Sequence, residues 1–193
     1  MIEYKSYDYT RMIPVDEYIL NYRDERRFMA YCRECRRYGN CWSCPPFHDS
    51  EDYLSGFRNL LIVCTQIIPL TLEVPDAVEA GQELIHKERS RLDKRLLALE
   101  EEYNGRAFYA GSCILCPWEE CTRRSGKACR YPLRIRRSLE ACGFDLGRTT
   151  SELFGIEMKW SENRNLPEYL LLVSGFLYDG EEPLCRKLSG EDA

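Results

Sequence analysis

Residues 31 to 47, YCRECRRYGNCWSCPPF, hold four cysteines within thirteen positions, followed by two prolines. The cysteines are Cys32, Cys35, Cys41 and Cys44, in the spacing C-x2-C-x5-C-x2-C. A C-x2-C pair places two sulfurs on one tight turn, so both can reach one ion or one cluster edge, and two more thiolates complete a four-coordinate shell. Glycine and proline break regular structure here, which predicts that the second pair lies in an irregular, metal-binding loop.

A second group of cysteines follows about seventy residues later in the spacing C-x2-C-x4-C-x7-C. Its members are Cys113, Cys116, Cys121 and Cys129. Two such groups in one chain point strongly to metal, whereas isolated core cysteines occur singly in apolar runs. We expect all eight thiols to be ligands.

The spacing says less about which metal is bound. Zinc knuckles of the C-x2-C type are usually separated by ~15–20 residues, and the five-residue gap in the first group is shorter. Iron–sulfur clusters accept shorter gaps and often have a proline after a ligand cysteine, as at Cys44-Pro45 and Cys116-Pro117. Neither group has the ferredoxin spacing. The pattern favours two 4Fe-4S clusters, with zinc as the alternative.

Loop entropy favours two independent centres. Each group closes only short loops, whereas a shared site would join segments some seventy residues apart, at a cost of a few kcal/mol that folding could supply. We therefore expect one local centre in each group.

Composition narrows the class of protein. The chain has 193 residues, a net charge of -5 and 44% hydrophobic residues, which suits one domain spanning 1–193, with cysteine-rich loops at 32–44 and 113–129. An odd count of eleven cysteines and the lack of an export signal argue against a secreted disulfide framework. No apolar run is long enough to cross a membrane. We expect a cytoplasmic protein.

Apolar periodicity predicts an α+β fold: a small mixed sheet of about four strands packed with helices. The expected helices are 15–32, 76–103 and 133–142, and the expected strands are 60–72, 106–111, 155–160 and 168–179. Cys64 falls inside an apolar strand and is expected in the core. Cys142 and Cys185 stand alone and are expected to be structural or exposed. Thioredoxin-like chemistry is disfavoured because Cys32 lies late in a predicted helix.

A basic segment accompanies the second group. The window from Cys121 to Arg137 holds seven Lys or Arg residues and no carboxylate. It could be a solvated face, or it could offset an anionic cluster and attract an acidic redox partner or an anionic ligand at segment 123–137. The acidic net charge argues against nucleic acid as a partner. The candidate side chains are Arg123, Arg124, Arg130, Arg134, Arg136 and Arg137.

The motifs CRECRRYGNCWSCPP, AGSCILC, GKACRYP and RRSLEACGFDL resemble an uncharacterised family of cysteine-rich prokaryotic proteins described as predicted metal-binding proteins. The similarity runs from about residue 28 to about residue 178. It implies a cytosolic metal-binding protein from organisms with strong iron–sulfur metabolism, with ligands at the eight cysteines. The PWEE insertion before Cys121 makes that residue the ligand that the resemblance supports least.

Three functional hypotheses follow. The leading one is an iron–sulfur protein with two 4Fe-4S clusters that transfers electrons or assists a redox enzyme. The second is a structural zinc protein with an Arg-rich docking surface. The third is an enzyme whose cluster, bound by three cysteines, leaves one iron open to substrate. Because the chain has no flavin, nicotinamide or nucleotide fingerprint, substrate chemistry would have to use the clusters or a partner.

Overall fold

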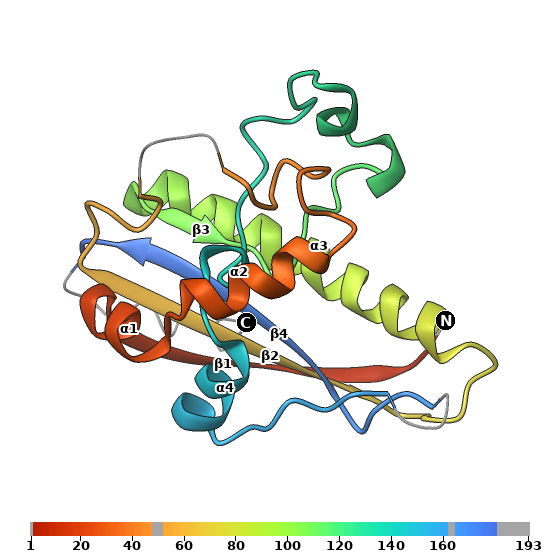
Figure 1. The fold of residues 1–193 in the computed structure, drawn as a ribbon. Helices are drawn as coiled ribbons and strands as arrows, with labels where there is room; N and C mark the ends of the chain where they lie inside the picture. Colours follow the sequence, from red (N-terminus) through yellow and green to blue (C-terminus); the bar gives the residue numbers. More distant parts are fainter. Residues whose placement is uncertain (1, 48–51, 162–164, 181–193) are drawn as a thin grey trace.

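A four-stranded antiparallel sheet forms the centre of the molecule (Figure 1). The structure is a computed structural model that describes residues 2–47, 52–161 and 165–180. The strand order is β1-β2-β4-β3. The strands are β1 (Tyr4–Pro14), β2 (Asn59–Pro69), β3 (Arg106–Phe108) and β4 (Leu170–Tyr178). The expected α+β class with four strands is confirmed, but every pairing is antiparallel, so the sheet is not mixed.

The two central strands are apolar because both of their faces are covered. Leu60, Leu61, Ile62, Val63 and Cys64 of β2 are all fully buried, as expected for Cys64. One face packs against α3 (Ala77–Tyr103), whose Leu92 and Leu96 join that core. The other face is covered by α1 (Val15–Tyr22), α4 (Leu146–Phe154) and the short helix η3 (Glu140–Cys142).

The long helix α3 begins where its sequence predicts. The Asp76 carboxylate accepts hydrogen bonds from the N–H groups of Val78 and Glu79, at 2.9 and 3.0 Å, and so caps the first turn. Asn104, in the left-handed conformation, follows the last turn.

The expected helix at 15–32 is divided into two. After α1, Asp24 leaves the helical conformation, and its carboxylate caps a new helix, α2 (Glu25–Glu34), by accepting the Arg27 N–H at 3.0 Å. The Asp24 N–H donates to the Gly143 carbonyl at 2.9 Å, which ties the break to the η3 segment. Cys32 therefore lies in the last turn of α2, as expected.

Two expected elements are wrong. Residues 155–160 form no strand, and the fourth strand of the sheet is instead β1, which pairs with β2 over its full length and was not predicted. Of the expected helix 133–142 only Glu140–Cys142 is helical. Arg136 in this segment directs its guanidinium to Glu100 of α3 and to backbone carbonyls of its own segment.

Among the described residues, no helix combines the length and apolar character required to cross a bilayer.

Candidate metal centre

The first cysteine pair lies at the C-terminal end of α2. The Cys35 N–H donates to the Cys32 carbonyl at 3.0 Å, so the pair forms the turn that ends the helix. Cys32 is half-buried and Cys35 exposed. Burial raises the pKa of Cys32, and the charges of Cys35 and Glu140 raise it further. This pair lies at the negative end of the helix dipole, where the helix backbone does not stabilise the negative charge of a thiolate.

The second pair lies in the loop that follows and is more deeply placed. Cys41 is 4% exposed, and the Cys44 N–H donates to its carbonyl at 3.0 Å. A hydrogen bond from the Cys44 thiol to Cys41 Sγ lowers the pKa of Cys41 and raises that of Cys44. The Ser43 hydroxyl lies 3.4 Å from Cys41 Sγ and 3.8 Å from Cys44 Sγ.

The second cysteine group reaches this loop across the fold. The Cys113 N–H donates to Ser43 Oγ at 2.8 Å, and it also helps lower the pKa of Cys41. Burial raises the pKa of Cys113 to about 11, and the charges of Cys41, Cys116 and Cys129 contribute in the same direction. The Cys41 charge also raises the pKa of Cys116, after burial and Cys121. Thiols from both groups therefore lie close enough to influence one another.

Backbone N–H groups point at two of these sulfurs. Leu115 N–H donates to Cys113 Sγ at 3.4 Å, and Tyr131 N–H donates to Cys129 Sγ at 3.3 Å. Hydrogen bonds to the charged form of a thiol favour that form, and thiolates are the form that binds metal. All four cysteines of this group are half-buried.

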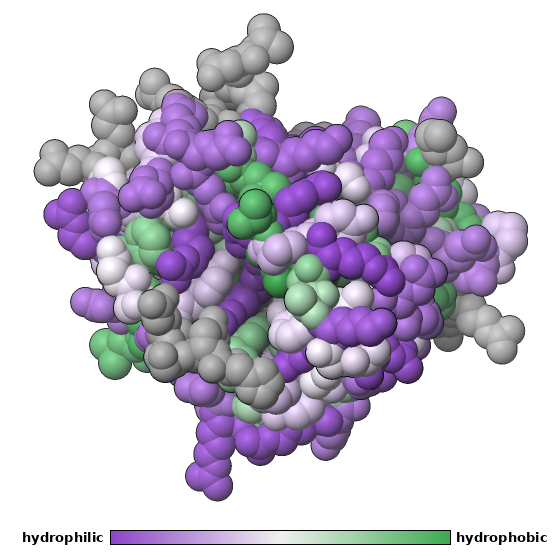
Figure 2. Space-filling model, turned by 90° about the horizontal axis from the view of Figure 1, so that it is seen from above, coloured by the Kyte–Doolittle hydropathy of each residue, from purple (hydrophilic) through white to green (hydrophobic). Residues whose placement is uncertain are grey.

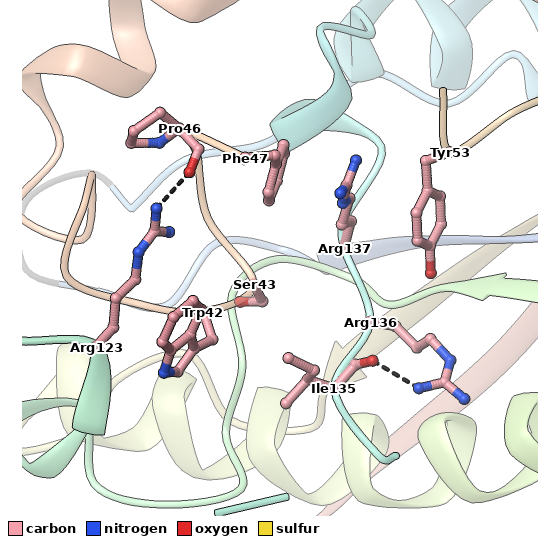
Figure 3. Close-up of a pocket in the computed structure, with 9 residues that line it drawn as sticks. All are labelled: Trp42, Ser43, Pro46, Phe47, Tyr53, Arg123, Ile135, Arg136 and Arg137. Carbon is pink, nitrogen blue, oxygen red and sulfur yellow. Dashed lines mark hydrogen bonds between the residues drawn. The ribbon is translucent and has the colours of Figure 1, made fainter. Parts of the chain in front are cut away.

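Side chains from the basic segment hold the two loops together. Arg123 donates to the carbonyls of Cys41 and Cys44, at 2.8 and 2.5 Å, and to that of Pro46 (Figure 3). Its guanidinium also lies 5.3 Å from the centre of the Trp42 ring, and Trp42 Nε1 donates to Thr122 Oγ1 at 3.3 Å. Figure 1 shows both loops standing together above the sheet, the first in orange and the second in green. We call residues 35–47 and 111–131 the cysteine lobe.

Four other arginines of the segment also have side-chain partners within the protein. Arg137 lies between the rings of Phe47 and Tyr53, 3.8 and 4.8 Å from their centres (Figure 3). Arg136 pairs with Glu100, and Arg130 with Glu120 at 3.7 Å. The guanidinium of Arg124 lies 5.0 Å from the centre of the Trp118 ring. The basic window is therefore in large part a set of internal braces, a role that the sequence analysis did not identify.

The lobe carries thiols but no finished coordination shell. In the parts of the chain that the structure describes, no three Cys, His, Asp or Glu side chains gather at the spacing that holds an ion. The donor chemistry nevertheless fits, because thiolates select zinc and iron–sulfur clusters over hard cations. Seven of the eight expected ligands lie in the cysteine lobe, and Cys32 lies at its margin.

The remaining cysteines lie away from this lobe. Burial raises the pKa of Cys64 to about 12 and that of Cys142 to about 12, as expected for neutral core thiols. Cys142, the last residue of η3, is 7% exposed and packs in the core. Cys185 lies outside the described residues.

Comparison with known proteins returns one match. A family model described as "Predicted metal-binding protein (DUF2284)" matches residues 13–177. No curated protein and no solved structure matches the chain. The match covers both cysteine groups and agrees with the resemblance carried by the cysteine motifs. The chain therefore belongs to the DUF2284 family of predicted metal-binding proteins.

Proposed function

We propose that this chain is an iron–sulfur protein whose centre is shared between the two cysteine groups and serves electron transfer. The observation that carries the proposal is the contact between the two loops, in which the Cys113 N–H reaches Ser43 between Cys41 and Cys44. This contact supports Cys41, Cys44, Cys113 and Cys116 as the ligand set. It favours one shared centre over the two independent centres expected from loop entropy.

The chain's own residues would supply three things to such a centre. The Leu115 N–H, which is directed at Cys113 Sγ, and the Ser43 hydroxyl beside Cys41 Sγ would stabilise sulfur charge. Arg123 neutralises charge at the loop and fixes its backbone. Trp42 and Trp118, which lie in the same two loops, would provide an apolar cover that limits water. A bound iron–sulfur cluster would accept and release single electrons.

The position of the lobe suits electron transfer. Cys44, Cys113 and Cys116 are only half-buried, which would leave the centre near the surface and within reach of a partner. Figure 2, which views the molecule from above, shows a largely hydrophilic face. Arg124, Arg130 and Arg134 are exposed and could attract an acidic redox protein.

Structural zinc is the second candidate, and one observation favours it. Two C-x2-C pairs from distant segments, with the Leu115 N–H directed at Cys113 Sγ, also resemble the paired knuckles of a four-cysteine zinc site. An enzyme with an open, three-cysteine cluster is a variant of the leading proposal in which one sulfur is not a ligand.

The test is the colour and metal content of anaerobically purified protein. Thiolate-to-iron charge transfer gives a brown protein with broad visible absorption that dithionite bleaches, whereas zinc is d10 and colourless. We expect iron and acid-labile sulfide. A colourless protein with stoichiometric zinc would overturn the iron–sulfur assignment and leave the zinc alternative.

A further inference from the structure

A large cleft lies along the open edge of β4. Strand β3 pairs with β4 only from Gly175 to Leu177, and Figure 1 shows it beside one end of the longer strand. The stretch Leu170–Val173 extends beyond β3 and lines a cavity of about 860 Å³. Successive residues of a strand point to opposite faces, so a cavity lined by four in a row wraps around the strand edge.

The walls of this cleft come from elements on both sides of the sheet. Gly81 and Ile85 of α3 line one side, and Leu146 and Met158 line the other. Trp118 of the cysteine lobe also lines it, with the guanidinium of Arg36 4.6 Å and that of Arg37 5.6 Å from its ring centre. A cavity of this size with mostly apolar walls is typical of a small-molecule site.

Three polar atoms from lining residues are shielded from solvent and have no hydrogen-bond partner among the described residues. They are Arg37 Nη1, Arg89 Nε and Glu140 Oε2. Arg89 is only 3% exposed, and its other nitrogens are already used by Ser112 and Asp93. Burial raises the pKa of Glu140. Leaving a buried donor or acceptor unpaired costs about 1–3 kcal/mol, so such groups mark where a ligand would bond.

We infer that this cleft binds a small organic carboxylate that has an apolar body and a hydroxyl or amino donor. The two guanidinium donors match a carboxylate, for which charge-assisted bonds are strong. Glu140 Oε2 matches the donor of the ligand, and the leucine and isoleucine walls match its apolar body. The open edge of β4 adds backbone groups to the same cleft. This inference does not depend on which metal the cysteine lobe holds.

The test uses the purified full-length chain and three probes of equal length: 2-hydroxyoctanoate, octanoate and octylamine. Isothermal titration calorimetry should show 2-hydroxyoctanoate binding most tightly and octanoate more weakly, with octylamine not binding. Replacing Arg37 by Gln removes one charge-assisted bond and should weaken both acids about tenfold. Leu170→Trp, which fills the cleft without touching the charged groups, should weaken both acids as well.

Arg26→Gln is the matched control, because Arg26 is exposed on α2 and does not line the cleft. It should leave both affinities unchanged, with circular dichroism confirming that all variants are folded. Absence of acid binding at millimolar concentration, equal binding of octylamine and octanoate, or folded Arg37→Gln and Leu170→Trp variants with unaltered affinity would overturn the inference. None of these outcomes bears on the metal content of the protein.

Discussion

At the scale of single residues, Arg123 shows how the cysteine lobe is held. Its guanidinium bonds three consecutive parts of the first loop, at Cys41, Cys44 and Pro46, while its backbone belongs to the second. A planar guanidinium with several fixed donors suits this role better than a lysine would. The sequence predicted a basic segment next to the cysteines, but a count of charges could not tell a brace from a docking surface.

Arg123→Gln should therefore loosen the lobe. Loss of charge-assisted bonds to three carbonyls should lower the free energy of unfolding by about 2–3 kcal/mol, measured by urea denaturation, and should lower the metal content of the purified protein. Arg130→Gln removes only an exposed ion pair with Glu120 and should cost less than about 1 kcal/mol. Equal losses in the two variants would contradict the bracing role.

Cys64 gives a prediction about both metal and pH. Cys64→Ala should leave metal content unchanged, because the thiol lies in the core strand β2. Its pKa rises from 9.0 to about 12 in the folded chain, so between these pH values the folded state holds a proton that the unfolded state has released. The thiol then costs stability as pH rises, by up to about 1.4 kcal/mol per pH unit.

The Cys64→Ala variant should accordingly lose less stability between pH 9 and 12 than the parent protein, when both are followed by chemical denaturation. Identical pH slopes in this range would show that the buried thiol is not the source. Loss of metal from this variant would show that the ligand assignment is wrong.

At the scale of elements, the position of α2 depends on a close approach to the η3 segment. Gly143 has a φ of 90°, and a Cβ built there would lie 2.8 Å from Glu25 Cα. Only glycine fits this contact, which also includes the hydrogen bond from Asp24 N–H to the Gly143 carbonyl. The sequence predicted that a helix ends at this glycine. In the structure a glycine is needed at this position because the backbone of α2 lies against it.

Gly143→Ala should be more damaging than an equivalent change at Gly155. Both glycines have positive φ, but nothing lies within 4 Å of a Cβ at Gly155. Backbone strain alone costs about 1–2 kcal/mol and should be common to both variants. The clash with Glu25 should add to it at Gly143 only, and α2 should lose protection in hydrogen exchange. Equal unfolding free energies for the two variants would contradict this account of α2.

At the scale of the whole molecule, the elements that a local sequence pattern marks were predicted correctly. The apolar run of β2 and the continuous apolar face of α3 were both expected, since each shows its periodicity over many residues. Strand β1 was missed because it is an edge strand whose tyrosines alternate with polar residues, so no apolar run marks it. Its pairing with β2 is a long-range property.

The meeting of the two cysteine groups could not be predicted from spacing either. Spacing favours the shortest loops and hence two local centres, but folding brings Cys113 to Ser43 across the chain and so supplies the long closure. The same fold leaves Cys32 and Cys35 at the end of α2. The two cysteine groups could thus be recognised from the sequence, whereas which of their members lie together depends on the tertiary structure.

The most direct test of the shared centre is the metal and sulfide content of three paired variants: Cys32→Ala with Cys35→Ala, Cys41→Ala with Cys44→Ala, and Cys113→Ala with Cys116→Ala. The shared centre predicts that the second and the third paired variant each lose all of the metal and sulfide, and that combining them removes nothing further. The first paired variant should keep its metal. Circular dichroism should show that all of these variants are folded. If the first and the second paired variant instead both lose the same half of the metal, and the third loses the other half, the two cysteine groups bind separate centres and the shared centre is wrong.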